Sequence, residues 1–119
     1  MEVNTYKNRI INEVITPMKE YMKECGRESG YNIFHILKCK SILFSYLKKL
    51  NKIINISDEQ IMKVVEWVVL SLNKLNEKTE YAIIETDARE SIYEIIQSAA
   101  IEAGLKNHDE DITVEWREW

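Results

Sequence analysis

The side chains best suited to bind a transition metal are two histidines and two cysteines, the only ones in the chain. His35 and Cys39 are four residues apart and share one face of a helix, and Cys25 and His108 complete the set. Zinc favours such Cys2His2 sets, but its structural sites use short, regular ligand spacings that this chain lacks. We therefore predict no metal site, and a partly buried thiol at Cys39.

Paired carboxylates are the second kind of chemical site that a helical protein uses, because two acids three or four residues apart share a face. Such pairs are Glu20 with Glu24, Glu77 with Glu80, and Glu90 with Glu94. The chain has no Glu-x-x-His sequence, which di-iron bundles require. It also lacks the Glu-x-x-Asp that a helical nucleotide pyrophosphohydrolase would place after its first acidic pair. The pairs alone do not predict an enzyme.

Other catalytic arrangements find no support in the sequence. Three glycines form no phosphate-binding loop, and no serine or cysteine has the neighbouring histidine that activates a nucleophile. The run Asp109-Glu110-Asp111 lacks the glycine and the closing glutamate of a calcium loop, which favours a solvated acidic loop. We predict a protein that is not an enzyme and needs no cofactor. A metal-dependent helical enzyme ranks third, after the two binding functions described at the end of this section.

Helical periodicity extends over almost the whole chain, which has one proline. Apolar residues three and four apart predict a first helix over 2–25, with Pro17 either kinking it or opening a second segment capped by Thr16. Gly26 ends this helix, and a second helix is expected over 32–54. Its apolar stripe is Ile36, Leu43, Leu47, Leu50 and Ile54.

Two further helices complete the expected bundle. Ser57 and Gln60 form a capping box that opens a helix over 57–76, with Ile56 packing on Ile61 as a hydrophobic staple. Asp87 and Glu90 suggest a similar start for a helix over 87–103, which Gly104 ends.

Two segments between and after these helices are ambiguous in the sequence. Residues 80–85 fit a short strand or a helical turn, and the acidic, aromatic tail 105–119 fits a short strand or a helix. We predict a single mainly all-α domain over 1–119, resembling a four-helix bundle on which the tail docks.

The net charge of −4 conceals a strong asymmetry along the chain. Residues 1–76 carry 12 basic and 8 acidic side chains, whereas residues 77–119 carry 4 basic and 12 acidic ones. Three explanations are open. The acidic third neutralises the lysine-rich second helix, or it faces a basic partner, or the lysines contact phosphates. The lysines in question include Lys38, Lys48, Lys49 and Lys52.

Large apolar side chains outside the main stripes are candidate contact sites. Trp67 and Leu70 lie off the core stripe of their helix, so they either receive the tail or form a homodimer contact. Trp116 and Trp119 either anchor the tail to the bundle or anchor a protein partner.

The expected location is the cytoplasm. The first 20 residues do not resemble a signal peptide, and the longest apolar runs, 67–70 and 81–84, are four residues each. A membrane span needs about 20, so we expect no membrane association. Abundant Ile, Lys and Asn suggest an AT-rich bacterial or mobile-element genome.

Together these features predict a binding protein: a small acidic antagonist, such as an immunity protein that neutralises a bacterial toxin. The expected partner is a protein with a basic surface, such as a toxin domain. The negative net charge disfavours nucleic acid as a partner. The alternative is a regulatory or nucleic-acid-associated module of a phage or mobile element. The residues expected to contact a partner are Glu85, Asp87, Glu90, Glu94, Asp109, Glu110, Asp111, Trp116 and Trp119.

Overall fold

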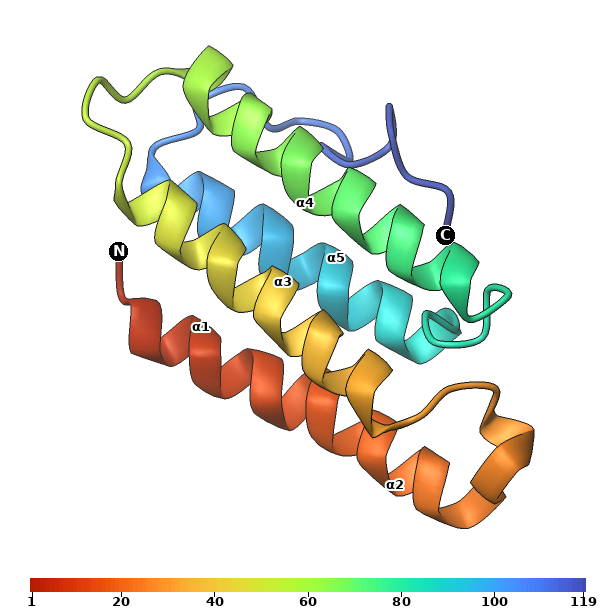
Figure 1. Cartoon of the computed structure of the whole chain (residues 1–119). Helices are drawn as coiled ribbons and strands as arrows, with labels where there is room; N and C mark the ends of the chain where they lie inside the picture. Colours follow the sequence, from red (N-terminus) through yellow and green to blue (C-terminus); the bar gives the residue numbers. More distant parts are fainter.

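The computed structural model describes residues 1–119. It contains four long helices and no β-strand, which confirms the mainly all-α fold. The first long helix consists of α1 (Val3–Ile10), a π-helical turn η1 (Ile11–Ile15) and α2 (Thr16–Cys25). It is followed by a short 3-10 turn η2 (Gly26–Ser29), α3 (Ile33–Asn51), α4 (Asp58–Lys78) and α5 (Thr86–Ala103). Successive long helices run in opposite directions, and the tail returns along α4 (Figure 1).

Pro17 neither splits the first helix nor starts a new one, because Thr16 keeps helical angles (φ −60°, ψ −46°) and makes no side-chain cap. Instead the turn before Pro17 is widened, and the Thr16 N–H donates to the carbonyl of Ile11, five residues back. A proline inside a helix removes one N–H and crowds the carbonyl four residues earlier. The π turn accommodates both effects within a continuous helix.

The second helix, α3, is shorter than the predicted 32–54. The prediction that Ile54 belongs to its core stripe was therefore wrong. It begins where the Asn32 side chain accepts from the N–H groups of Phe34 and His35, and it ends at Asn51. Ile54 therefore lies beyond the helix and is 90% exposed, although Ile36, Leu43, Leu47 and Leu50 are buried as predicted.

The other helix ends test the capping predictions. The Ser57 hydroxyl accepts from the Gln60 N–H (3.2 Å), which confirms one half of the capping box; the Gln60 side chain makes no return bond to the Ser57 N–H. The prediction for Asp87 was wrong: Glu85 takes the N-cap position of α5, without a side-chain cap, and Asp87 lies inside the first turn. Gly104 ends α5 with φ 122°, and the Leu105 N–H donates to the carbonyl of Ala100.

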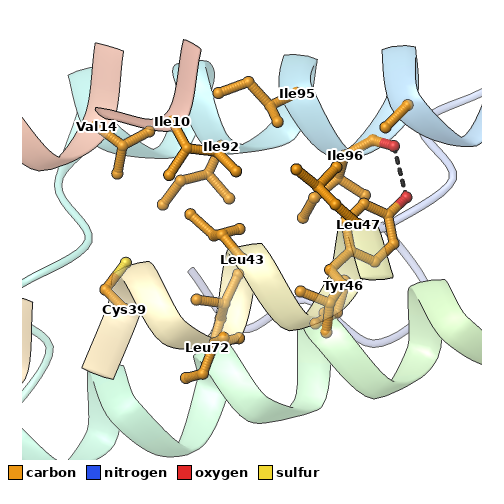
Figure 2. Packing of buried hydrophobic residues seen from close by; sticks show 14 of the residues in the cluster. Ile10, Val14, Cys39, Leu43, Tyr46, Leu47, Leu72, Ile92, Ile95 and Ile96 are labelled. Carbon is orange, nitrogen blue, oxygen red and sulfur yellow. Dashed lines mark hydrogen bonds between the residues drawn. The ribbon is translucent and has the colours of Figure 1, made fainter. Parts of the chain in front are cut away.

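The core lies between the four helices, with α3 in contact with α1, α4 and α5 (Figure 2). Leu43, Leu47 and Leu72 are fully buried, as are Ile92 and Ile96. Tyr46 is buried with them, and its hydroxyl donates to the carbonyl of Ile96 at 2.7 Å, which joins α3 to α5. This bond satisfies a phenol that would otherwise be costly to bury. None of the helices combines the length and the apolar composition that a membrane-spanning segment requires.

We expect Leu43→Ala to destabilise the fold strongly, because the side chain is completely buried and its loss leaves a cavity between α3 and its neighbours. The expected loss in the free energy of unfolding is about 2–5 kcal/mol, measured by urea denaturation. Leu37→Ala is the matched control, since Leu37 lies on the same helix and is 45% exposed. Equal losses for the two variants would contradict the assignment of the α3 core face.

Candidate functional site

A groove of about 400 Å³ lies between the first long helix and the start of α5. One wall comes from η1 and α2 and the other from residues 83–91, with Tyr31 between them. Five carboxylates line it, and no lysine or arginine does. The acidic residues are Glu13, Glu20, Glu24, Glu85 and Asp87.

The first wall follows from helical spacing. Glu13, Pro17, Glu20 and Glu24 recur at intervals of three and four, so they lie on one face. The π turn lies at the start of this wall, where Glu13 and Pro17 both line the groove. The expected pair of Glu20 and Glu24 is thus part of a larger acidic surface.

The second wall is positioned by two buried polar residues at the end of α4, Asn76 and Thr79. The Asn76 Oδ1 accepts from the Ile84 N–H (3.1 Å), and the Thr79 hydroxyl accepts from the Ile83 N–H (3.2 Å). Residues 80–85 are therefore a turn, neither the strand nor the helical turn that the sequence allowed. Glu80 adopts a left-handed conformation there, with φ 54°. These bonds determine where Glu85 and α5 begin.

Gly30 brings the loop before α3 against this turn. Its φ of 85° is in the left-handed region, and a Cβ at this position would lie 2.7 Å from the Cβ of Ala82. The close approach places Tyr31 in the groove, where its ring stacks with Tyr21 (centroids 6.3 Å apart, planes at 23°). Any side chain larger than glycine would separate the two segments.

The charges in the groove are largely uncompensated within the chain. Glu13 is paired with Arg9, whose Nε lies 2.9 Å from the carboxylate. The other four acids form no ion pair. Burial, reinforced by the negative charge of Glu85, raises the pKa of Tyr31 to about 12, so this phenol stays neutral at physiological pH. The groove can attract a cationic group, because no lysine or arginine is among its lining residues.

The acidic residues predicted to bind a partner are divided by the structure into separate places. Glu85 and Asp87 line the groove, and Glu90 and Glu94 are exposed further along α5. Asp109, Glu110 and Asp111 border a second cavity of about 500 Å³, formed with Met62 of α4. The Asp58 carboxylate holds this end of the tail by accepting from the N–H groups of Lys106 and Asn107 (2.9 and 3.0 Å).

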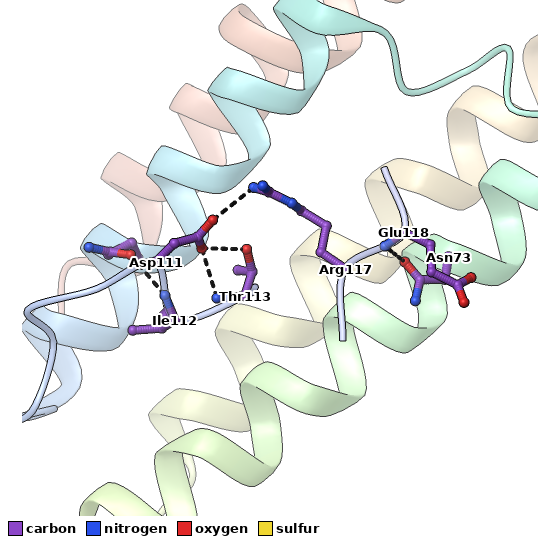
Figure 3. Close-up of polar contacts among 7 residues, drawn as sticks. Asn73, Asp111, Ile112, Thr113, Arg117 and Glu118 are labelled. Atoms are coloured by element: carbon purple, nitrogen blue, oxygen red, sulfur yellow. Dashed lines mark hydrogen bonds and ion pairs between the residues drawn. The ribbon is translucent and has the colours of Figure 1, made fainter. Parts of the chain in front are cut away.

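The tail 105–119 is a series of turns, neither strand nor helix, because its polar groups bond to side chains of the bundle (Figure 3). Asn73 of α4 donates to the carbonyl of Trp116 (2.8 Å) and accepts from the N–H of Glu118 (3.1 Å). Asp111 accepts from the Thr113 hydroxyl and forms an ion pair with Arg117 (3.0 Å). Asp111 thus has partners within the chain, whereas Asp109 and Glu110 are exposed.

The aromatic contact residues are engaged to different degrees. Trp116 and Trp119 are half-buried and pack on the core, as expected of anchors for the tail. Trp67 is half-buried with the Lys49 ammonium 4.6 Å from its ring, and Leu70 is 42% exposed. The hydrogen bonds of the tail to α4 are made by Asp58 and Asn73, and neither Trp67 nor Leu70 takes part in them.

The histidine and cysteine side chains do not gather. His35 Nδ1 accepts from the Asn32 N–H (3.1 Å) as part of the cap of α3, while Cys39 is fully buried in the core. Burial raises the pKa of the Cys39 thiol to about 12. No group of three or more His, Cys, Asp or Glu side chains has an arrangement suited to a metal ion.

No family model, curated protein or solved structure matches this chain. The geometry of the acidic groove is therefore the basis for a functional assignment. The sequence indicated the acids of its α5 wall, Glu85 and Asp87, and paired Glu20 with Glu24, but it did not assign that pair or Glu13 to a binding surface. The spacing of Glu13, Glu20 and Glu24, seven and four residues, places them on one helix face and was the available signal.

We expect Asn76→Ala to loosen the second wall of the groove, because it leaves the buried N–H of Ile84 without an acceptor. The expected loss in unfolding free energy is about 1–3 kcal/mol. Hydrogen exchange at the Ile83 and Ile84 amides should accelerate by more than exchange in α3. Lys78→Ala, an exposed change in the same turn, is the control. Unchanged exchange at Ile84 would contradict the role given to Asn76.

Proposed function

We propose that this chain is a non-enzymatic binding protein whose acidic groove receives basic side chains of a protein partner. The biological role proposed is that of an antagonist, such as an immunity protein that binds and neutralises a toxin. The observation that supports the proposal most directly is a groove with five carboxylates and no cation among its lining residues.

The lining suits lysine or arginine better than a small cation. Val14, Met18, Ile83 and Ala88 give the groove an apolar part beside its carboxylates. Lysine and arginine side chains fit this lining, since each has an apolar stem that ends in a charged head group. A partner side chain can bury its stem against these residues while its head group reaches the acids.

The groove is also built to stay in place. The bonds from Asn76 and Thr79 hold one wall, and the continuous helix through Pro17 forms the other. A preformed surface loses less conformational entropy on binding than a mobile one. This rigidity supports recognition of one particular arrangement of basic groups.

The remaining exposed acids extend the negative field beyond the groove. Glu90 and Glu94 continue along α5, and Asp109 and Glu110 lie at the far end of that helix. Exposed charges of one sign accelerate encounter with an oppositely charged partner more than they strengthen the final complex. The proposed interface thus uses the groove for contact and these acids for steering.

We expect a short lysine-rich peptide, used as a probe, to shift the amide resonances of residues 13–24 and 83–91 in an NMR titration. The double change Glu85→Gln, Asp87→Asn should weaken binding about two- to thirtyfold, since it removes two exposed ion pairs that contribute about 0.2–1 kcal/mol each. The control is Glu66→Gln, Glu77→Gln, two exposed acids outside both acidic cavities. Equal weakening by both double variants would contradict a groove-specific interaction.

The antagonist role has its own test. Co-expression of this chain with the product of the adjacent open reading frame should relieve growth inhibition caused by that product. The Glu85→Gln, Asp87→Asn variant should protect less than the wild-type chain or the control. An adjacent product that is harmless, or a variant that protects fully, would contradict the proposed role.

A further inference from the structure

A second surface of the molecule has the opposite charge. A cavity of about 530 Å³ lies between α1 and α3, which run side by side (Figure 1). Its polar lining consists of ammonium, hydroxyl and amide groups, and no carboxylate contributes to it. The lining residues are Val3, Lys7, Ser41, Phe44, Ser45, Lys48 and Asn51.

Lysine side chains from two helices lie over the ring of Phe44 at this cavity. The Lys7 ammonium of α1 lies 5.2 Å from the centroid of the Phe44 ring, and the Lys40 ammonium of α3 lies 5.3 Å from it. The negative face of an aromatic ring attracts each ammonium. The two positive charges nevertheless repel each other, and neither forms an ion pair within the chain. An anion at this place would relieve the repulsion.

The positive surface continues along the outer face of α3. Phe34, Lys38, Ser41, Ser45 and Lys48 follow intervals of three and four and lie on one face, about 20 Å long. Phe34 is 76% exposed at one end of this face. No acidic residue occurs between Ser29 and Ser57, so this helix carries no carboxylate of its own.

We propose that this basic face, formed by Lys7 and the outer side of α3, binds single-stranded nucleic acid through its phosphodiester backbone. Lysines supply point charges for phosphates, serines supply hydrogen-bond donors, and the exposed ring of Phe34 offers a stacking surface for an unpaired base. The face has no arginine to read base edges in bidentate fashion, so the interaction tolerates different sequences. An acidic peptide would use the lysines but would leave Phe34 without a function.

The overall charge of −4 does not oppose this assignment, because no residue that lines the cavity is acidic and α3 carries no carboxylate. The acidic groove involves η1, α2 and the start of α5, whereas the basic face involves α1 and α3. A field at the surface is set by the nearby charges, since salt screens those beyond about 8–10 Å. The proposal is therefore independent of the proposed function.

The test is fluorescence anisotropy with a labelled oligouridylate of about 12 nucleotides. The wild-type chain should bind at low salt, and its affinity should fall steeply as salt is added. The double change Lys40→Gln, Lys48→Gln should lower the slope of log K against log salt by about 1.4, since each phosphate contact on a single strand contributes about 0.7. Phe34→Ala, which alters an exposed side chain, should weaken binding about fivefold or more.

The matched control is Lys23→Gln, Lys74→Gln, which removes the same charge from exposed positions on α2 and α4. It should leave the slope almost unchanged. The groove variant Glu85→Gln, Asp87→Asn should also keep wild-type affinity for the oligonucleotide, which separates this proposal from the previous one. Absence of binding at low salt, equal effects of the two lysine pairs, or equally tight binding of a polyglutamate peptide of the same length would overturn it.

Discussion

Helix α3 is packed against α1, α4 and α5, and this burial determines how the remaining surfaces are arranged. The stripe from Ile36 through Leu43 to Leu50 must face the core, and the Tyr46 hydroxyl fixes its register against α5 through the carbonyl of Ile96. Lysine is almost never fully buried without a partner. The lysines of α3 are therefore excluded from the core: Lys40 and Lys48 lie on the side next to α1, and Lys49 lies beside Trp67 of α4. A shift of the core stripe would displace the basic face with it.

Buried polar side chains determine the positions of the non-helical segments, as the apolar stripe does for α3. Asn76 and Thr79 hold the turn before α5, and Asn73 holds the tail against α4. Backbone groups that leave a helix need other partners when they are buried. Three polar residues near the end of α4 supply them, so one region of one helix positions both a wall of the acidic groove and the aromatic end of the chain.

Much of the helical architecture could be predicted because its signals are local. The caps, glycines and apolar spacing of α3, α4 and α5 lie within or beside those helices, and the predicted ends at Ser57 and Gly104 are confirmed. Two errors concerned helix ends: α5 begins after Glu85 and is not capped by Asp87, and α3 ends at Asn51, before Ile54. In the tail distant groups decide, because side chains such as Asn73 bond to its backbone, and it is neither strand nor helix. The groove joins Glu20 to Glu85 across the fold, a proximity that no local pattern encodes.

The charge asymmetry of the sequence persists in three dimensions instead of being cancelled. The ion pairs in the structure link Arg9 with Glu13, Lys63 with Glu59, and Arg117 with Asp111, so none joins an α3 lysine to an acid of the last third. The molecule measures 45 × 28 × 21 Å, which is several times the screening length of about 8 Å at physiological salt. The acidic groove lies between the first long helix and the start of α5, and the basic cavity lies between α1 and α3; they share no lining residue and act almost independently. A partner at either face experiences the local charge, which the total of −4 does not describe.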